Sequence, residues 1–482
     1  MSNTTEPKRI PFQTRRGELI TPEQSERIHA TVRRILAEIG LEVLEPAYQE
    51  RLRTAGLRIQ DDRLYIEAKV VDEFVAEHRQ RLQSGQQERQ SSQPVDERRL
   101  TLGISPYPLN VHDLRSGEVV PFTTERLIEM TRLVDSLTDQ GVSGAPPGTP
   151  LDVPPDLQPI AQFRIAAIYA RQGATAVDPT SSRTARFLFE LSDVMGEPIR
   201  SLPVYMPTPL RLGGESLQVV LACLDRLEHI SVSSMPAAGL SGPLQPFGSL
   251  ALTAAETIGG AIAVQAMTGK PVSFFPAIFP ADLRTGAMVY GSPENMLYHM
   301  LTADFNRFYG YPDGYAPENI HVLAKLPDGQ SAAERAAILM TGAALGARHF
   351  MCAGVLSLDE IFSAEQLLLD CEIRDWAQHA IQGLWLGEEV VDDWVEEVRA
   401  GLTQGYIKLD STLDHYRQQT WYPRWFDRGM IGQWINQDRP SLLPRLRAEA
   451  LRRIAAHTYE LDGERRREID RIYQSAVRSI QG

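Results

Sequence analysis

The chain contains few cysteines and no long apolar run, and these absences exclude several classes of protein. Its three cysteines, Cys223, Cys352 and Cys371, are scattered along 482 residues and are not paired at metal-binding spacing. This usage fits a reduced, intracellular setting. No uninterrupted run of about 18 apolar residues occurs, and the N-terminus lacks the apolar core of a signal peptide. We therefore expect a cytoplasmic protein with no membrane span.

An excess of positive charge is also missing. The chain has 49 basic and 62 acidic residues, giving a formal net charge of −13. No basic stripe appears along it, which argues against nucleic acid as a partner. The hydrophobic content of 43% is ordinary for a globular protein, and the length is sufficient for one large barrel with additions.

Several familiar catalytic motifs are absent as well. There is no GxSxG elbow, no GxxxxGK[ST] loop and no GxGxxG after a strand. No glutamates stand at the strand ends where a retaining glycosidase needs its carboxylate pair. The histidines His229, His299, His321 and His349 are isolated, without an HxH or HExxH pattern. The sequence therefore predicts no bound metal.

The first part of the chain predicts a small α+β unit. Thr21, Pro22 and Gln24 form a capping box with proline at the first helical position, so a helix should run to about Gly40. A hairpin is expected around Asp61-Asp62, and a third helix should end near Arg81. The polar, Gln- and Ser-rich residues 83–97 predict a mobile surface loop. Two further short strands are expected on either side of residues 113–117.

From about residue 139 the chain alternates strand-like and helical segments. Eight strand candidates lie near 141–145, 174–178, 202–206, 230–234, 272–276, 310–315, 349–353 and 405–409. Helical patterns separate them at the spacing that a (β/α)8 TIM barrel requires. The sequence thus predicts an α/β protein with an N-terminal α+β extension (1–138), a barrel (139–412) and a C-terminal helical extension (413–482).

Side chains at strand ends are the default catalytic candidates in a barrel. They are Asp178, Tyr205, Met235, Phe275, Asp313, Tyr315, His349, Cys352, Lys408 and Asp410.

Aromatic rings are frequent in the same segments. They are Tyr107, Tyr205, Phe274, Phe275, Phe279, Tyr311, Tyr315 and Phe350. Such rings attract a quaternary ammonium ion through their π faces, with about 0.5–2 kcal/mol for each ring. Because strands favour aromatic residues anyway, the alternative is that half or more belong to the core.

Three cationic side chains are candidates for holding an anionic group. Arg348 and His349 adjoin a predicted strand, and Arg284 lies in a loop. For Arg284 the alternative is that it braces its own turn between Asp282 and Gly286. A structural histidine is an equally common explanation at His349.

Several loop blocks together resemble one family. They read MPAAG at 235–239 and ADLRTGAMVYGSPE at 281–294, with further blocks at 113–117, 153–156, 207–210, 326–330 and 367–373. In order and spacing they resemble the trimethylamine methyltransferase family, and in particular its branch without pyrrolysine, which includes glycine betaine methyltransferases. The likeness covers most of the chain.

The resemblance implies a (β/α)8 barrel that moves a methyl group from a quaternary amine, glycine betaine-like, to the cobalt(I) of a corrinoid protein. Cobalamin would be supplied by that partner. The missing catalytic motifs agree with this chemistry, since a quaternary ammonium already carries a neutral amine as its leaving group and the cofactor is the nucleophile. The protein has to align the methyl group in a dry pocket.

These considerations give each candidate residue a role. We expect His349 and Asp178 to be catalytic. Substrate binding is expected from Tyr205, Phe275, Tyr315, Phe350, Tyr107 and Arg348. Contacts to the corrinoid are expected from Met235, Gly239, Asp313 and Lys408.

Two other functions remain open on sequence grounds. One is a non-catalytic barrel that binds a betaine or amine without turnover. The other is a lyase or aldolase that uses Lys325 or Lys408 as a Schiff base. We also expect self-association, for which the helices carrying Trp376 and Trp394 could supply a surface, although buried packing would explain these tryptophans equally well.

Overall fold

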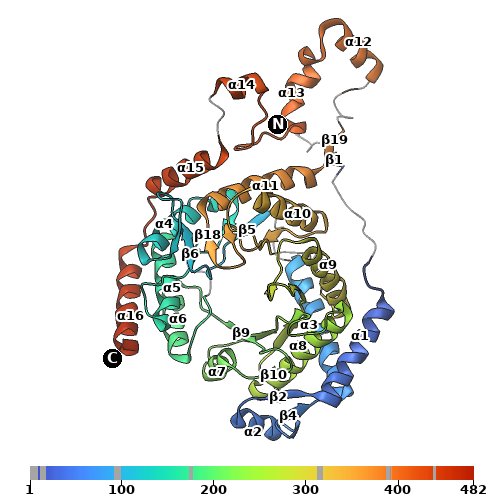
Figure 1. Ribbon diagram of the computed structural model, residues 1–482, viewed down its shortest axis with the longest axis vertical. Helices are drawn as coiled ribbons and strands as arrows, with labels where there is room; N and C mark the ends of the chain where they lie inside the picture. The colour runs from blue at the N-terminus through green and yellow to red at the C-terminus, as the bar shows by residue number, and fades with distance from the viewer. Residues whose placement is uncertain are drawn as a thin grey trace.

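The protein is an α/β chain in which short strands lie inside a ring of helices (Figure 1). The computed structural model describes residues 9–10, 18–91, 99–172, 177–311, 319–386, 391, 393–437 and 441–481. The candidates Asp313 and Tyr315 lie outside the described residues, as do most of the strand predicted at 174–178 and residues 312–315 of the strand predicted at 310–315.

The N-terminal unit follows its sequence signals closely. Helix α1 (Pro22–Arg34) begins with the predicted capping box, in which the Thr21 side chain accepts a hydrogen bond from the Gln24 amide. A π-helical turn (Ile35–Ile39) continues it to Gly40, where φ is +70°. Glycine is suited to this position because it adopts a positive φ without a steric penalty.

A small sheet completes this unit. Its strands and the adjoining helix are β2 (Leu41–Val43), β3 (Arg58–Gln60), β4 (Arg63–Tyr65), β10 (Arg211–Leu212) and α2 (Pro46–Thr54). The predicted hairpin is confirmed, since β3 and β4 pair antiparallel across Asp61 and Asp62, both in the left-handed region. The predicted end of the third helix is wrong: α3 (Ala68–Ser91) continues through much of the segment expected to be a loop.

Two parallel ladders form the centre of the molecule. Strand β5 (Thr101–Gly103) pairs with β8 (Val142–Ser143) on one side and with β16 (His349–Phe350) on the other. In the second ladder β11 (His229–Ser233) lies between β9 (Ser201–Tyr205) and β13 (Val272–Phe275). The register places Ser233 beside Tyr205 and Phe275, so the carboxyl ends of these strands meet at one edge.

The ladders correct the predicted set of strands at two places. Strand β5 belongs to the central sheet, although the sequence analysis placed its residues in the N-terminal extension. The strand predicted at 405–409 is wrong, because Tyr406–Lys408 form an exposed 3-10 turn after helix α12. An additional parallel bridge joins Asn319 to Met351. Among the described residues the hydrogen-bonded ladder does not close into a complete barrel.

Helices connect the strands and cover them on the outside. They are α4 (Thr124–Asp135), α5 (Gln158–Tyr169), α6 (Ser182–Met195), α7 (Glu215–Ala222), α8 (Pro246–Thr268), α9 (Pro293–Phe308), α10 (Gly329–Ala344) and α11 (Ala364–Gln382), with 3-10 turns at Thr138–Gln140 and Pro155–Leu157. Helix α8 is long and apolar enough to cross a membrane, but 89% of its most apolar window is buried inside the protein. It is a core helix.

Further short strands lie outside the two central ladders, in the segments that connect the ladder strands and the helices. They are β12 (Ala237–Ala238), β14 (Phe279–Asp282), β15 (Ala287–Met288), β17 (Val355–Leu356), β18 (Ile361–Phe362), β6 (Asn110–His112) and β7 (Val119–Pro121). The two strands predicted around residues 113–117 are confirmed as the antiparallel pair β6 and β7.

The C-terminal part contains two different kinds of helix. Helices α15 (Leu442–Ala456) and α16 (Gly463–Gln481) pack against the ring, α15 on α4 and α11 and α16 on α5 and α6 (Figure 1). The remaining elements extend away from the ring. They are α12 (Trp394–Gln404), α13 (Asp410–Gln419), α14 (Ile431–Asn436) and the pair of β1 (Arg9–Ile10) with β19 (Leu384–Trp385).

Candidate functional site

Two cavities open where the central strands end. The first, which we call the strand-end cavity, has a volume of about 680 Å³ and is lined by residues that follow β5, β9, β11, β13 and β16. The second, the outer cavity, has a volume of about 690 Å³ and lies between β9, α5 and α7. The two cavities share three lining residues, Tyr107, Asp178 and Tyr205. A site in this position follows the rule that strand carboxyl ends carry the chemistry.

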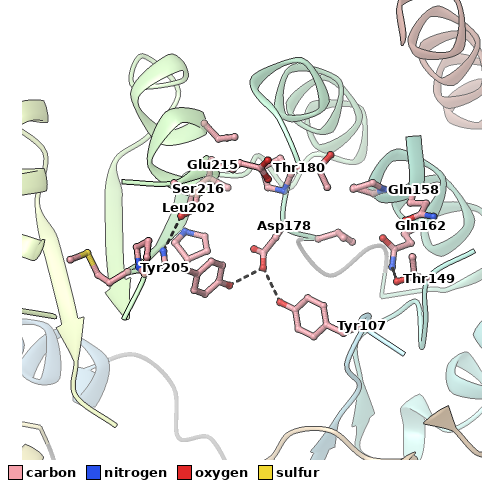
Figure 2. Close-up of a pocket in the computed structure, with 18 of the residues that line it drawn as sticks. Tyr107, Thr149, Gln158, Gln162, Asp178, Thr180, Leu202, Tyr205, Glu215 and Ser216 are labelled. Atoms are coloured by element: carbon pink, nitrogen blue, oxygen red, sulfur yellow. Dashed lines mark hydrogen bonds between the residues drawn. The ribbon is translucent and has the colours of Figure 1, made fainter. Parts of the chain in front are cut away.

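The shared residues form a hydrogen-bonded bridge, which Figure 2 shows. The hydroxyl groups of Tyr107 and Tyr205 both donate to Oδ2 of Asp178, each at 2.8 Å. Tyr107 follows β5, Tyr205 ends β9, and Asp178 lies between them in the chain. None of the described residues donates a hydrogen bond to the other carboxylate oxygen, Oδ1 of Asp178. The bridge therefore holds a carboxylate in place and leaves one oxygen for a ligand.

The two tyrosines act as hydrogen-bond donors in this arrangement. Burial raises the pKa of the Tyr107 hydroxyl, and the neighbouring Asp178 carboxylate raises it further. The same two causes raise the pKa of Tyr205. Both hydroxyls thus keep their protons over any physiological pH and remain hydrogen-bond donors to Asp178.

Aromatic rings line the strand-end cavity beyond this bridge. Phe275, Phe279 and Tyr290 belong to the lining. The rings of Phe279 and Tyr290 lie 5.8 Å apart, and Tyr290 lies edge-on to His321 at 5.1 Å. Together with the two tyrosines of the bridge, they present several π faces close to one carboxylate, the combination that attracts a quaternary ammonium ion.

Beside these rings the lining is polar, and several of its buried polar atoms have no hydrogen-bond partner among the described residues. Buried atoms of His299 (Nε2), Thr302 (Oγ1) and His321 (Nδ1) have no hydrogen-bond partner among the described residues. A buried polar atom without a partner costs about 1–3 kcal/mol, so such atoms are rare unless a ligand or water satisfies them. Three of them in one cavity indicate a place that binds a polar group.

Three potential metal ligands also meet in this polar part. The ligand atoms of His321, Cys352 and Asp359 all lie within 4.8 Å of one another. His321 Nε2 is 2.7 Å from Oδ1 of Asp359. Burial by itself lowers the pKa of His321, but the adjacent Cys352 and Asp359 more than reverse this effect and raise the pKa to about 10. Positive charge is therefore favoured at this place.

A buried ion pair fixes the turn that carries Cys352. Arg335 on α10 and Asp370 on α11 are both fully buried and lie 2.9 Å apart. Arg335 donates to the Cys352 carbonyl at 3.3 Å and also to the carbonyl of Val355, while the Gly354 amide donates to Asp370 at 2.7 Å. Cys352 itself has a φ of +72°, a conformation that typically costs about 1–3 kcal/mol outside glycine. The surrounding contacts maintain that conformation.

Neither cavity has an arginine or lysine among its described lining residues. The two histidines of the strand-end cavity differ in charge. Burial lowers the pKa of His299 to about 4 and leaves it neutral, whereas the pKa of His321 is raised. Any positive charge for an anionic ligand group must come from the His321 side of the strand-end cavity.

The structure brings five of the predicted site residues together. Tyr107, Asp178, Tyr205, Met235 and Phe275 all line the strand-end cavity. The sequence predicted Asp178, Tyr205, Met235 and Phe275 at strand ends, and the parallel register of β9, β11 and β13 brings Tyr205 and Phe275 to one edge.

The predicted residues around β16 lie elsewhere, and their roles need correction. Phe350 is fully buried in the core, because alternation along the strand turns it away from the cavity that Met351 lines. Arg348 precedes the strand and donates to the carbonyls of Ala343 and Ala347 at the end of α10. It stands at the amino end of the strand, away from the site.

His349 also begins this strand and is absent from the described lining of both cavities. Its Nδ1 atom contacts the Thr101 hydroxyl at 2.8 Å, and Nε2 contacts Met351 Sδ at 3.1 Å. Burial lowers the pKa of His349. These features describe a structural histidine inside the sheet, so the structure does not support a catalytic role.

The remaining predicted residues lie around or outside the site. Lys408 is exposed in the 3-10 turn after α12 and not at the end of a strand, and its contact to the corrinoid stays a prediction. Gly239 lies in an exposed turn after β12 with a φ of +86°. Arg284 braces its own turn, as the structural alternative predicted, by donating to Asp282 at 2.8 Å.

Sequence reasoning missed the polar side of the cavity. His299 and His321 were read as isolated histidines, and Asp359 was not singled out, because their neighbours in space come from separate segments. The usable signal was weak: a Cys, a His and an Asp each stand within a few residues of a predicted strand end.

The comparisons with known proteins agree with the geometry. The family described as trimethylamine methyltransferase (MTTB) matches residues 2–471. The chain is 25% identical over 444 residues to the glycine betaine methyltransferase of Desulfitobacterium hafniense strain Y51, covering 87% of this chain and 88% of that protein. It is 31% identical over 243 residues to the trimethylamine methyltransferase MttB of Methanosarcina barkeri, covering 49% and 48%.

One solved structure also aligns with the chain. It is the monomethylamine methyltransferase MtmB of Methanosarcina barkeri, at 10% identity and a TM-score of 0.40 over 92% of this chain and 96% of that one. This likeness is too low to bear on the fold. The match to the family over nearly the whole length is decisive: the chain belongs to the trimethylamine methyltransferase family.

Proposed function

We propose that this protein transfers a methyl group from a quaternary amine, glycine betaine-like, to the cobalt(I) of a corrinoid carried by a partner protein. Membership of the family and the similarity to a glycine betaine methyltransferase over most of both chains support the reaction class. The observation that carries the proposal for the substrate is the Asp178 carboxylate, held by two tyrosines in a cavity with aromatic walls.

The bridge suits a quaternary ammonium ion for a simple reason. Such an ion has no N–H to donate, so a protein recognises it by negative charge and by π faces rather than by hydrogen bonds. Asp178 supplies the charge, and the rings of Tyr107, Tyr205 and Phe275 supply the faces. Each ring contributes about 0.5–2 kcal/mol in such a cage, depending on desolvation.

The site needs no acid or base for this reaction. The leaving group is a neutral tertiary amine, which departs without receiving a proton. The lining residues therefore act by orienting one methyl group and by excluding water, which raises the rate through proximity and desolvation. The raised pKa values of the two tyrosines agree with a holding role, since neither hydroxyl gives up its proton.

The loops around the cavity fit an apolar macrocycle. Leu244 and Leu283 are exposed and stand beside Gly239, where a Cβ would lie 3.2 Å from Leu283 and 3.3 Å from Leu244. The side chains of Leu240 and of the lining residue Met235 are exposed as well. An exposed apolar rim of this kind marks a binding surface. When bound there, the corrinoid supplies cobalt(I), the nucleophile that accepts the methyl group.

We further propose that the two parallel ladders are arcs of one (β/α)8 barrel that begins near Leu100 rather than at residue 139. The pairing of β5 with both β8 and β16, together with the Asn319–Met351 bridge, supports this arrangement. A cytoplasmic location is proposed on the burial of α8. The division into domains and self-association remain predictions.

The test is a spectroscopic assay of cobalt(I) cobalamin with the protein and a panel of amines. The panel contains glycine betaine, proline betaine, carnitine, choline and trimethylamine. We expect methylcobalamin to appear with a quaternary amine and not with trimethylamine. Turnover of trimethylamine alone would contradict the proposed substrate class.

The same panel of amines distinguishes a methyltransferase from the alternative, a non-catalytic barrel that only binds the amine. In that case calorimetry would show binding of a quaternary amine while no methylcobalamin forms. The Asp178→Asn variant shows whether any turnover depends on the bridge, with Asp193→Asn, at a surface ion pair outside both cavities, as the matched control.

A further inference from the structure

We propose that His321, Cys352 and Asp359 bind a divalent metal ion of the zinc class in the wall of the strand-end cavity. The open coordination position of that ion faces the cavity and takes an oxygen atom of the substrate, such as a betaine carboxylate. This second part rests on the proposed function, whereas the metal site itself does not.

The three residues reach one point from separate segments. His321 lies on the extended segment that bridges to Met351, and the Ile320 amide donates to the Met351 carbonyl at 3.0 Å. Cys352 follows β16 directly, and Asp359 lies in the turn between β17 and β18. All three belong to the lining of the strand-end cavity.

Their chemistry fits zinc. Zn²⁺ binds thiolate sulfur at about 2.3 Å and imidazole nitrogen or carboxylate oxygen at about 2.0–2.2 Å, so two ligands of a tetrahedral site lie roughly 3–4 Å apart. The ligand atoms here lie within 4.8 Å of one another. Small side-chain rotations of about 1 Å would complete the geometry. Three protein ligands leave the fourth position open, as in catalytic zinc sites.

Two features show that the position is prepared for a ligand. The Nδ1 atom of His321 is buried without a hydrogen-bond partner among the described residues. The turn that presents Cys352 is held by the fully buried pair of Arg335 and Asp370, which fixes Cys352 in the left-handed region.

The charged groups of the cavity also favour a divalent metal ion at this place. A thiolate and a carboxylate would neutralise a divalent ion, and the described lining contains no arginine or lysine to hold an anionic end of a substrate. The carboxylate of Asp178 and the His321 cluster both belong to this lining, and the ring of Tyr290 lies 5.1 Å from that of His321. A betaine has one cationic and one anionic end, which the carboxylate and a metal ion at the His321 cluster would complement.

The first experiment measures the metal content of the full-length protein. After incubation with zinc sulfate and removal of excess ion, we expect about one zinc per chain by mass spectrometry of the metal. In Cys352→Ser, His321→Gln and Asp359→Asn the stoichiometry should fall by at least tenfold. Absence of zinc from the unaltered protein, or a zinc content in all three variants equal to that of the unaltered protein, would overturn the proposal.

Controls separate metal loss from unfolding. Cys223→Ser removes another buried thiol, one outside the cavity, and should retain the zinc. Asp359 is only partly buried, so Asp359→Asn should keep the circular dichroism and melting temperature of the unaltered protein. Retention of the fold with loss of zinc in this variant supports the site directly.

The second experiment uses cobalt(II) in place of zinc, because its visible spectrum reports its ligands. A thiolate-to-cobalt charge-transfer band is expected, and it should be absent in Cys352→Ser. Addition of glycine betaine should shift the visible bands, while tetramethylammonium, which has no oxygen, should leave them unchanged. Equal responses to both ions would contradict coordination of the substrate oxygen.

The experiments distinguish failure of the metal site from failure of the proposed methyl transfer. Metal binding without any methyl transfer to cobalamin would leave the site standing and refute the methyltransferase reaction. Methyl transfer by protein that contains no metal, at the same rate with and without added zinc, would refute coordination of the substrate by the metal ion. Rapid alkylation of Cys352 that zinc does not slow would indicate a cysteine nucleophile instead and would also overturn the proposal.

Discussion

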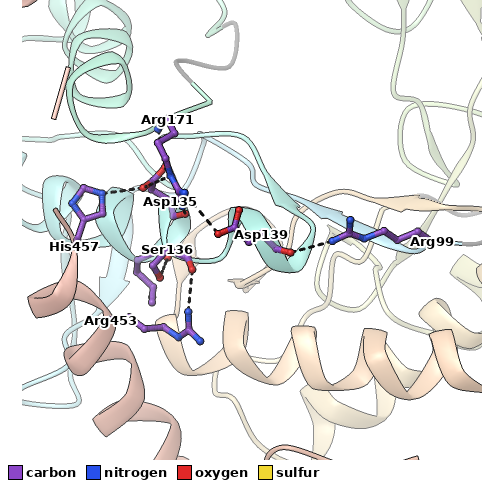
Figure 3. A network of polar contacts seen from close by, with 8 residues as sticks. Arg99, Asp135, Ser136, Asp139, Arg171, Arg453 and His457 are labelled. Carbon is purple, nitrogen blue, oxygen red and sulfur yellow. Dashed lines mark hydrogen bonds and ion pairs between the residues drawn. The ribbon is translucent and has the colours of Figure 1, made fainter. Parts of the chain in front are cut away.

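Two polar clusters in this molecule have similar residues and different construction. On the outside of the ring, Asp135 accepts from the Arg171 amide at 2.7 Å and contacts His457 Nε2 at 3.1 Å, as Figure 3 shows. In the strand-end cavity, His321 contacts Asp359 at 2.7 Å beside Cys352. Both clusters pair a histidine with an aspartate.

The two clusters differ in whether all their buried polar atoms have hydrogen-bond partners. No buried nitrogen or oxygen of Asp135, Arg171 or His457 lacks a partner among the described residues. That cluster fastens the end of α15 to the end of α4. The cavity cluster leaves His321 Nδ1 without a partner and faces open space. The cluster around Asp135 is thus satisfied by its own contacts, whereas the cavity cluster has one buried polar atom left for a ligand.

The largest expected effect comes from the buried pair that supports Cys352. Asp370→Ala leaves the Arg335 charge buried without compensation, which should destabilise the protein by about 3–5 kcal/mol. Thermal unfolding would show this as a large drop in the melting temperature. The double variant Arg335→Met/Asp370→Leu removes both charges and should lose much less. Equal losses in the two variants would contradict the assigned role of the pair.

Acid stability should depend on a buried histidine that belongs to neither cluster. Burial lowers the pKa of His78 from 6.5 to about 4, and its ring packs 4.4 Å from that of Phe274. Because the folded pKa is depressed, stability should be full above pH 6.5 and fall as pH drops toward 4. The loss is at most about 3 kcal/mol.

His78→Phe keeps the ring and removes the titration. Chemical unfolding at pH 7 and at pH 4.5 should show a smaller difference in unfolding free energy for this variant than for the unaltered protein. An unchanged pH dependence would mean that other groups, such as His299, control acid unfolding.

A smaller loss of stability is expected in the cluster of Asp135, Arg171 and His457. His457→Ala removes one buried contact to Asp135 and should reduce the unfolding free energy by about 1–2 kcal/mol. Methyl transfer should not change, because the cluster lies outside both cavities. A lower rate of methyl transfer with unchanged stability would show that this cluster also serves the reaction, and would contradict a purely structural role.

The smallest effect is expected at the exposed turn. Arg284 is paired with Asp282 at the surface, where an ion pair is screened by solvent. Arg284→Ala should leave the melting temperature and the methyl transfer rate unchanged within error. A loss of transfer with an unchanged melting temperature would show that this ion pair positions the proposed apolar rim at Leu283.

The sequence predicted most of the scaffold because its signals are local. The capping box of α1, the helices between the central strands and the hairpin at Asp61-Asp62 follow from side chains a few residues apart. It failed at 405–409, because a short apolar stretch after Gly405 looks the same in a strand and in an exposed 3-10 turn. It also failed at Thr101–Gly103, since a three-residue strand carries too little pattern to be assigned to a sheet.

The site was predictable only in part, for the same reason. Tyr107, Asp178 and Tyr205 each stand near a strand end, and parallel pairing brings strand ends together. His321, Cys352 and Asp359 meet through a turn whose conformation depends on Arg335 and Asp370 from two distant helices. No spacing rule records such a tertiary contact. The misplacement of Phe350 and Arg348 came from strand register, which shifts the face of every side chain.

The most direct test of the central claim is the calorimetric binding of glycine betaine to the unaltered protein and to Asp178→Asn, with Asp193→Asn as the matched control. We predict a loss of about 100-fold in affinity, or about 2.7 kcal/mol, in Asp178→Asn only. Equal affinity in all three proteins would show that the bridge of Tyr107, Asp178 and Tyr205 does not hold the quaternary ammonium group.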